Sequence, residues 1–440
     1  MGCALTAGAA DPSDTVTALP VERVWAGHPV GFCLLTQPPY QFVAYYDARR
    51  RMSVAQRRLG SKKWTITKLP SALGWDSHNY VTLALDRDGF LHLSGNMHCV
   101  PLVYFRSERP FDATSLVRVK KMVGERESRV TYPVFLHDLN GRLVFRYRDG
   151  GSGNGDDLYN VYDERSRTWR RLMEQPLTSG KGRMNAYCTT PKLGPDGRFH
   201  VVWVWRDTPD CASNHDLSYA RSADLVHWTD AAGRPLTLPI TLENSDIVDP
   251  VPPGGGLLNV NREVGFDNAG RPVVTYHKYD AHGDLQVYAA RHDGLAWRIV
   301  QVSDWKGYRW EFSGGGAIVV EVKVGAVRAL GDGRLALKYR RPGDAGVWVL
   351  DEETLRPIPG AKVPAEPPLL PRRFRKIEST FPGMVKRTRT DSGKAPPGMR
   401  YVLTWETLPA NRDRPRRPPL PEPSMLRVLC IPAGSTAREH

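Results

Sequence analysis

Long apolar runs, helical periodicity and paired cysteines are all scarce in this 440-residue sequence. No run approaches the roughly 18–20 apolar residues that a membrane span requires, so no membrane partner is expected. Few windows place apolar residues at helical spacing, which predicts little helix. The six cysteines form no CxxC pair and no zinc-type spacing: Cys3, Cys33, Cys99, Cys188, Cys211 and Cys430. They predict neither a disulfide framework nor a zinc site.

A secretory signal is also missing from the visible N-terminus. The start, MGCALTAGAADPSD, has neither the basic beginning nor the apolar centre of such a signal. Two locations therefore stay open, the cytoplasm and the exterior after removal of a signal, and the sequence does not decide between them.

The charge is strongly positive: 61 Lys and Arg residues stand against 47 Asp and Glu residues, a net charge of +14. Arginine can hold a carboxylate through two parallel hydrogen bonds. No recognisable nucleic-acid module accompanies the charge, so nucleic acid is not expected as a partner. The expected partner is an acidic polysaccharide or oligosaccharide, bound by a monomer.

A turn glycine between two strand-like runs recurs along the chain. The run VTLALD precedes Gly89 and FLHLSG follows it, and the same pattern surrounds four later glycines at spacings of 52 to 73 residues: Gly141, Gly197, Gly270 and Gly333. Asp-Gly turns between alternating runs are typical of antiparallel hairpins. Units of this length match propeller blades of four strands.

We therefore predict an all-β fold, a single β-propeller of seven blades with four antiparallel strands each. Six or eight blades are alternatives because the final unit is irregular, and a pair of β-sandwiches is a weaker one. The propeller is predicted to span residues 25–432. The N-terminal segment 1–24 is a candidate for a strand that closes the ring, and residues 433–440 are expected to form a tail.

Two histidines bracket the predicted hairpin of residues 81–94. His78 precedes its first strand and His98 follows its second, with Asn79 and Asn96 beside them. Because those two strand ends lie side by side in an antiparallel pair, we expect both imidazoles at one pocket. The alternative for each histidine is a structural, hydrogen-bonded role.

Aligning the units on the turn glycine reveals a repeated set of polar residues on the second strand. Side chains alternate along a strand, so odd offsets share one face. Basic and histidine residues recur there: His98, Arg146, Arg148, Arg206 and His277. We predict that they surround one mouth of a central cavity, although structural ion pairs are an alternative.

Several segments resemble a known family: DSHNY, SGNMH, VTYPVF, RYRDGGSGNGD, GRMNAY and WRDTPD. They resemble BNR-repeat-type propellers that include polysaccharide lyases of uronate glycans, such as ulvan or the rhamnosyl-glucuronate caps of arabinogalactan. The resemblance spans at least residues 25–316. It implies cleavage by β-elimination.

Such a lyase needs a base for the C5 proton, an acid for the leaving oxygen, and a cation for the carboxylate. We predict His78 or His98 as the base and Tyr147 as the acid. Tyr147 has an even offset, which places it between blades unless the strand bulges. The remaining candidates would hold the substrate: Asn79, Asn96, Arg146, Arg148, Asn185, Tyr187, Arg206 and His277.

Two other functions stay open. A glycoside hydrolase would need two carboxylates about 5–9.5 Å apart, for which Asp76, Asp149 and Asp207 are the candidates. A non-catalytic glycan-binding propeller would use exposed aromatic residues, and Trp203, Trp205 and Trp310 are its candidates.

No catalytic metal is predicted and no cofactor is assigned. A structural divalent cation such as calcium is an open alternative in two segments rich in Asp and Asn, residues 244–256 with Asp246 and Asp249, and residues 151–157. Neither follows EF-hand spacing, and a polar turn is the favoured interpretation.

Overall fold

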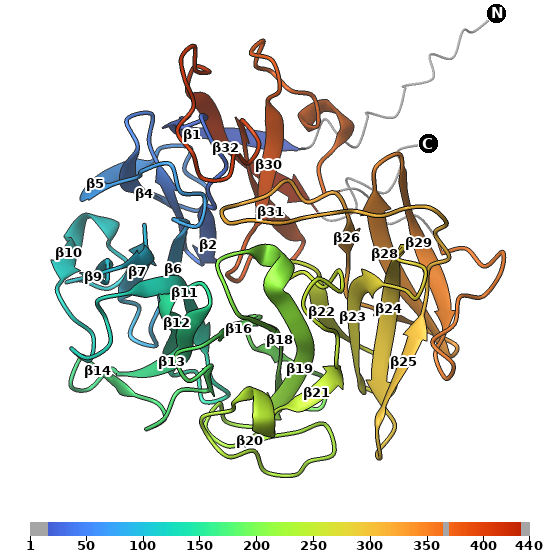
Figure 1. The fold of residues 1–440 in the computed structure, drawn as a ribbon. Helices are drawn as coiled ribbons and strands as arrows, with labels where there is room; N and C mark the ends of the chain where they lie inside the picture. The colour runs from blue at the N-terminus through green and yellow to red at the C-terminus, as the bar shows by residue number, and fades with distance from the viewer. Residues whose placement is uncertain (1–15, 364–368, 433–440) are drawn as a thin grey trace, which may run out of the picture. The chain divides into compact units, whose positions relative to one another are not determined.

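The computed structural model describes residues 16–363 and 369–432 (Figure 1). Regular structure in these ranges consists of β-strands and a few single-turn 3-10 helices, which confirms the all-β prediction. Within the same ranges, no helix has the length and apolar character needed to cross a bilayer. The predicted tail, residues 433–440, and residues 1–15 of the N-terminal segment lie outside the described part.

The chain forms two compact units. Among the described residues, unit 1 comprises 16–96, 103–120 and 369–432, and unit 2 comprises 97–102 and 121–363.

Unit 1 consists of three antiparallel four-stranded sheets, as predicted for single blades. The first holds β1 (Thr17–Val24), β32 (Ser424–Pro432), β31 (Met399–Thr407) and β30 (Val385–Thr390). The second holds β2 (Cys33–Gln37), β3 (Tyr40–Tyr46), β4 (Arg51–Arg58) and β5 (Thr65–Ala72). The third holds β6 (Val81–Leu85), β7 (Leu91–Gly95), β9 (Tyr104–Ser107) and β10 (Leu116–Val119). Strand β1 from the N-terminal segment pairs antiparallel with β32, the last strand.

Unit 2 contains two larger sheets in which successive antiparallel groups are joined at their edges. One sheet includes β8 (His98–Val100), β11 (Val130–His137), β12 (Leu143–Gly151), β13 (Asn154–Asp163), β14 (Thr168–Arg171), β15 (Thr178–Ser179), β16 (Asn185–Cys188), β17 (Lys192–Leu193), β18 (Phe199–Arg206), β19 (Asn214–Ser222), β20 (Trp228–Thr229) and β21 (Asp246–Asp249). The other includes β22 (Arg262–Phe266), β23 (Pro272–Tyr279), β24 (Leu285–His292), β25 (Trp297–Gln301), β26 (Lys323–Val324), β27 (Arg328–Gly331), β28 (Arg334–Arg341) and β29 (Asp344–Asp351). Within each of these sheets, one parallel residue pair joins two successive antiparallel groups. Gly155 on β13 pairs with Asn185 on β16 in the first sheet, and Phe266 on β22 pairs with Arg328 on β27 in the second.

The recurring turn glycines lie where the sequence predicts them, immediately before β7, β12, β18, β23 and β28. All five have left-handed φ values, for example 83° at Gly89 and 78° at Gly270. In the first sequence repeat, the aspartate three residues before the glycine closes the turn. Asp86 Oδ1 accepts hydrogen bonds from the backbone N–H groups of Asp88 and Phe90. Glycine adopts this backbone conformation without steric cost, which explains the repeat.

His98 differs from the expected arrangement. The hairpin of β6 and β7 forms as predicted, with Val81 opposite Gly95. His98 then begins the separate strand β8, which pairs with β11 of unit 2. The backbone turns at Asn96, whose φ is 59°, a left-handed value that asparagine tolerates. His78 therefore belongs to unit 1 and His98 to unit 2, and a shared pocket stays a prediction.

Candidate functional site

Five side chains of unit 2 lie close together where successive antiparallel groups of strands meet. We call them the Tyr187 cluster, which consists of His98, Tyr132, Arg148, Tyr187 and Arg206. Register explains why they meet, because Thr131 lies opposite both Arg148 and His98, and Asn185 lies opposite Arg206. The sequence candidates His98, Arg148, Tyr187 and Arg206 are thus brought together.

Two guanidinium groups lie against the Tyr187 ring. The Cζ atoms of Arg148 and Arg206 are 5.6 Å and 5.1 Å from its centroid, within the range of cation–π attraction. Arg206 also donates to the Tyr187 hydroxyl at 3.3 Å, and Ser152 Oγ lies 2.7 Å from the same oxygen. The hydroxyl is therefore surrounded by groups that stabilise a negative charge on it.

This environment changes the acidity of Tyr187. Burial disfavours the phenolate, but the positive charges of Arg148 and Arg206 outweigh burial and hold the pKa of Tyr187 below its ordinary value. A phenolate can accept a proton, and the ionised fraction at a given pH increases as the pKa falls. Tyr187 has the electrostatic surroundings of a general base.

Arg148 is an unusual buried cation. Its Nε donates to the Gly150 carbonyl at 3.3 Å, whereas its two buried terminal nitrogens have no hydrogen-bond partner within residues 16–363 and 369–432. The side chain is only 3% exposed. Leaving a buried charge incompletely paired costs free energy, so such groups need an explanation, and an anionic ligand would supply the missing acceptors.

The loop between β12 and β13 is shaped around this cluster. Asn185 Oδ1 accepts from the Gly153 backbone N–H at 2.5 Å, which holds the loop that carries Ser152. Gly153 has φ 78°, and a Cβ there would lie 2.6 Å from the Asp207 carbonyl oxygen. Asn185 therefore positions the loop, and Gly153 allows the close approach.

Arg262 holds the other side of Tyr187. Its Nε donates to the Tyr187 carbonyl at 2.9 Å. Burial lowers the pKa of Arg262 to about 10, which still leaves it charged at neutral pH. The tyrosine is consequently fixed at its hydroxyl and at its backbone.

Tyr132 and His98 form the more exposed part of the cluster, and both are half-buried. The Tyr132 ring lies 6.1 Å from the Tyr187 ring and 6.3 Å from the His98 ring, between centroids. Tyr132 occupies a β-bulge between Thr131 and Val134 and has φ 56°. Bulges commonly re-aim side chains beside functional sites, and the cluster has this feature.

Arg146 and Tyr147 lie on the same strand as Arg148 but in structural networks. Arg146 Nε donates to Asp157 at 2.7 Å, and this buried partner outweighs desolvation and raises the pKa of Arg146 above its usual value. The Tyr147 hydroxyl donates to the Arg126 carbonyl at 3.1 Å and accepts from Arg171 at 2.9 Å. Burial, partly offset by Arg171, raises the pKa of Tyr147 to about 12.

His277 lies in the core of unit 2. Its Nδ1 is 2.8 Å from the Gly256 carbonyl, and its ring packs against Trp310 at 5.6 Å. Burial lowers the pKa of His277 to about 4, so the ring is neutral at ordinary pH. This environment resembles that of a structural histidine.

The residues considered for stacking and for calcium are occupied by protein contacts. Trp203, Trp205 and Trp310 are buried, so they present no exposed platform. Asp249 pairs with Lys278 Nζ at 2.6 Å, and Asp246 accepts from Trp297 Nε1 at 2.9 Å.

His78 forms the corresponding charged feature of unit 1. Its Nδ1 lies 2.7 Å from Asp76 Oδ1 and 3.3 Å from Asp413 Oδ2. Burial alone lowers the pKa of His78, but hydrogen bonds to Asp413 and Asp76 outweigh it and raise the pKa to about 9. His78 is therefore a cation at neutral pH.

The two asparagines beside the histidines make contacts within unit 1. Asn96 Nδ2 donates to Ser71 Oγ and to the Ala72 carbonyl, both at 2.9 Å. The Asn79 carbonyl accepts from the Tyr46 hydroxyl at 2.6 Å, while its buried Oδ1 has no partner in the described ranges.

Sequence reasoning missed four residues of these sites: Ser152, Tyr132, Arg262 and Asp413. Tyr132 lies in the segment VTYPVF, where the proline after it signals irregular strand geometry. Ser152 lies in a loop interpreted only as a turn. Nothing local marks Arg262, and Asp413 lies in a proline-rich connector that carries no motif.

Comparisons with known proteins agree with the architecture. A model described as BNR repeat-containing family member matches residues 40–305. The crystal structure of the polysaccharide lyase Uly1 is 14% identical, covers 94% of this chain and 99% of its own, and has a TM-score of 0.60. An ulvan lyase bound to a glucuronate and sulfated rhamnose saccharide has 14% identity, 94% and 96% coverage and the same TM-score of 0.60. Curated protein sequences contain no match. These findings confirm the β-propeller prediction, while the number of seven blades stays a prediction.

Proposed function

The chain belongs to the BNR repeat-containing family, and from this premise we propose that it is a polysaccharide lyase that cleaves a uronic-acid-containing glycan by β-elimination. The observation that carries the proposal is the juxtaposition in unit 2 of an incompletely paired buried arginine, Arg148, with Tyr187, whose pKa is lowered. The likeness in fold to an ulvan lyase and to the polysaccharide lyase Uly1 supports the same class of substrate.

In the proposed reaction, Arg148 binds the uronate carboxylate. Its terminal nitrogens supply the two parallel donors that a carboxylate accepts. Neutralising the carboxylate makes the C5 proton more acidic and stabilises the enediolate-like charge of the transition state. Arg206 contributes a second positive charge while it holds the Tyr187 hydroxyl.

Tyr187 is the proposed base. Its phenolate takes the C5 proton, and the electron pair of the C5–H bond forms the C4–C5 double bond. The bond between C4 and the glycosidic oxygen breaks, and the leaving oxygen takes a proton from His98. This assignment differs from the sequence prediction of a histidine base and Tyr147 as the acid, since here a tyrosine is the base and His98 the acid. The tyrosine is Tyr187 because Tyr147 has a raised pKa and two structural hydrogen bonds.

His78 was predicted from the sequence as a candidate base, and we propose substrate binding for it instead. A histidine with a pKa of about 9 is protonated at neutral pH and is a poor base there, but it is a suitable cation for an acidic glycan.

Both alternatives are less well supported by the side chains. The hydrolase candidates all have cationic partners, since Asp76 lies beside His78, Asp149 accepts from Arg126 at 2.7 Å, and Asp207 lies 3.0 Å from His215. The tryptophans of the binding-module alternative are buried. A propeller that only binds an acidic glycan would account for Arg148 but not for the lowered pKa of Tyr187 beside it.

The test measures the rate at which the Tyr187→Phe variant cleaves a uronate glycan by elimination. The unsaturated product is followed by its ultraviolet absorbance. We expect kcat to fall by about 10²–10⁴-fold, the scale for loss of a general base, while the fold is retained. Tyr147→Phe is the matched control and is expected to keep turnover close to wild type at a small cost in stability.

The lowered pKa of Tyr187 also predicts that kcat rises with pH as Tyr187 ionises. Arg206→Gln removes one of the two cations beside the ring and should shift this rise to higher pH.

If Tyr187→Phe turns over normally while Tyr147→Phe loses turnover, Tyr147 is the catalytic tyrosine instead. If uronate glycans give no absorbance change with the wild-type protein under any condition, the lyase proposal is wrong.

A further inference from the structure

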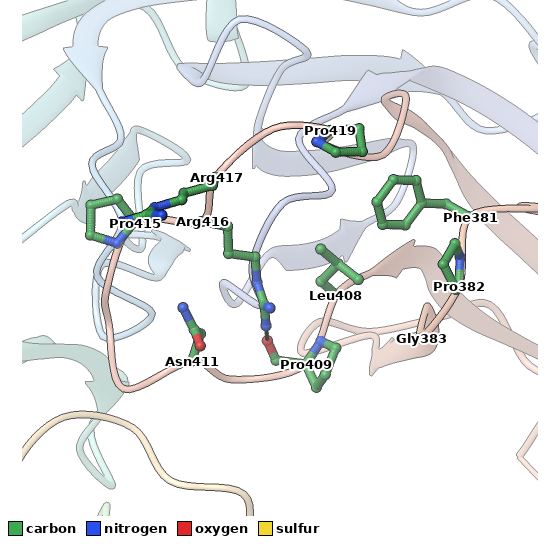
Figure 2. A pocket seen from close by; sticks show the side chains of 10 residues that line it. All are labelled: Phe381, Pro382, Gly383, Leu408, Pro409, Asn411, Pro415, Arg416, Arg417 and Pro419. Atoms are coloured by element: carbon green, nitrogen blue, oxygen red, sulfur yellow. Dashed lines mark hydrogen bonds between the residues drawn. The ribbon is translucent and has the colours of Figure 1, made fainter.

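A pocket in unit 1 lies under the connector between β31 and β32, well away in sequence from the family match at residues 40–305. Its volume is about 490 Å³, in the range of small-ligand sites. Figure 2 shows its lining, which comes from two segments: Phe381, Pro382, Gly383, Leu408, Pro409, Asn411, Pro415, Arg416, Arg417 and Pro419.

The charges of this lining all have one sign. Arg416 and Arg417 line the pocket, and none of the ten lining residues is acidic. Arg416 donates from a terminal nitrogen to the Pro409 carbonyl at 2.8 Å, as drawn in Figure 2, but its buried Nε has no hydrogen-bond partner among the residues described. The pocket therefore has a donor and a positive charge to offer to an anion.

Apart from Asn411, the remaining lining is apolar and rich in proline. Phe381, Leu408 and the prolines present carbon surfaces suited to the C–H face of a sugar ring. Proline restricts the backbone, so a site built on prolines loses little conformational entropy on binding. The connector is further held by the Asn411 side chain, whose Nδ2 donates to the Arg414 carbonyl at 3.1 Å.

We propose that this pocket is an accessory binding site for a uronate residue of an acidic glycan. The two arginines take the carboxylate, and Phe381 and Leu408 pack against the ring. A planar carboxylate matches the guanidinium fork, which favours it over a neutral sugar. The choice of a uronate rests on the proposed function, whereas the anion site itself follows from the lining.

The same connector reaches His78. Asp413 accepts from the Ser77 backbone and hydroxyl at 2.9 Å and 2.6 Å and lies beside His78, three positions before Arg416. Both Arg412 and Asp413 have left-handed φ values, 54° and 58°. The chain therefore turns tightly at the contact with His78, just before the arginines that line the pocket. One short segment thus carries the pocket arginines and the His78 partner.

The experiment measures binding of methyl β-glucuronoside by calorimetry in an Arg148→Gln background, which removes the proposed carboxylate contact of the Tyr187 cluster. We expect binding to persist there and to weaken at least about tenfold when Arg416→Gln and Arg417→Gln are added. Arg414→Gln is the matched control, because Arg414 is an exposed arginine of the same connector that does not line the pocket. Melting curves of all variants check that the fold is retained.

Equal binding of methyl β-glucoside would overturn the carboxylate assignment, and tighter binding of a sulfated glucoside would replace the uronate by a sulfate ester. Unchanged binding after the Arg416 and Arg417 substitutions, or an equal loss with Arg414→Gln, would overturn the site. Loss of binding with Arg148→Gln alone would place uronate binding in the Tyr187 cluster and leave the proposed function standing. The elimination assay on Tyr187→Phe tests that function independently.

Discussion

Arg146 and Arg148 are two residues apart on β12 and share one face of the strand, yet their environments differ. Arg146 has the carboxylate of Asp157 as a buried partner, while the terminal nitrogens of Arg148 have none in the described ranges. Alternation along a strand determines which face a side chain occupies, but only its neighbours determine whether its charge is available. The same difference separates Tyr147 from Tyr187.

The His78–Asp413 pair predicts a specific pH dependence of stability. The pKa of His78 is raised from 6.5 to about 9, so its contribution is complete below pH 6.5 and is lost as the pH rises through about 9. Hydrogen bonds from His78 and Ser77 overcome burial and lower the pKa of Asp413 from 3.8 to about 2, so its contribution is complete above pH 3.8 and is lost toward pH 2. The pair therefore stabilises the folded state across the intervening range.

Asp413→Asn should lower the unfolding free energy by roughly 1–3 kcal/mol at pH 6, the scale of a hydrogen bond to a charged group. Calorimetric melting at pH 6 and pH 10 should show a smaller difference from wild type at pH 10, where His78 is neutral. His282→Asn, at an exposed histidine, is the control. A difference that is equal at both pH values would contradict the ion pair.

At the scale of the element, two hairpins repeat one Asp–His–Tyr triad around a buried histidine. His92 on β7 has Nε2 3.2 Å from Asp86 and Nδ1 2.7 Å from the Tyr104 hydroxyl. His200 on β18 has Nε2 2.9 Å from Asp196 and Nδ1 2.6 Å from the Tyr219 hydroxyl. A carboxylate only accepts, so in each ring Nε2 donates to the aspartate, while Nδ1 lies within hydrogen-bond distance of the tyrosine hydroxyl. Each triad links the turn, the second strand and the following strand.

We expect His92→Ala to lower the unfolding free energy by about 2–5 kcal/mol, because it leaves a core cavity and removes a partner from Asp86 and from Tyr104. His200→Ala should behave similarly, since His200 is also fully buried. Denaturant unfolding measures both, with the exposed His282→Ala as control. Turnover per folded molecule should stay near wild type, and a loss of turnover without loss of stability would assign these histidines to the chemistry instead.

At the scale of the whole molecule, the net charge of +14 should govern binding of the acidic glycan. The Debye length falls from about 10 Å at 0.1 M salt to about 3 Å at 1 M, so affinity for a uronate glycan should decrease over this range. The same glycan with its carboxyl groups reduced is the control, and its weaker binding should change little. Equal affinity of the two glycans in low salt would show that the arginines do not select the charge.

The sequence by itself determined the all-β class, the antiparallel hairpins and the recurring turns. These features depend on local chemistry, since alternating side chains and an Asp-Gly turn specify a hairpin within about fifteen residues. It also identified Arg148, Tyr187, Arg206 and His98 as members of a candidate site, because the repeat places them at matching strand ends.

Only the tertiary structure decided which of these groups is available for chemistry. Asp413 reaches Ser77 and His78 across 336 positions of sequence, Arg262 holds Tyr187 across 75, and β8 leaves the predicted hairpin to pair with β11. A pKa or an ion pair depends on the distance between groups in space and on their burial. Both are determined by strands that lie far apart in the sequence, so no local sequence pattern predicts them. For this reason the sequence predicted Tyr147 as the catalytic tyrosine and Tyr187 as a substrate contact, whereas in the fold two cations lie against the ring of Tyr187.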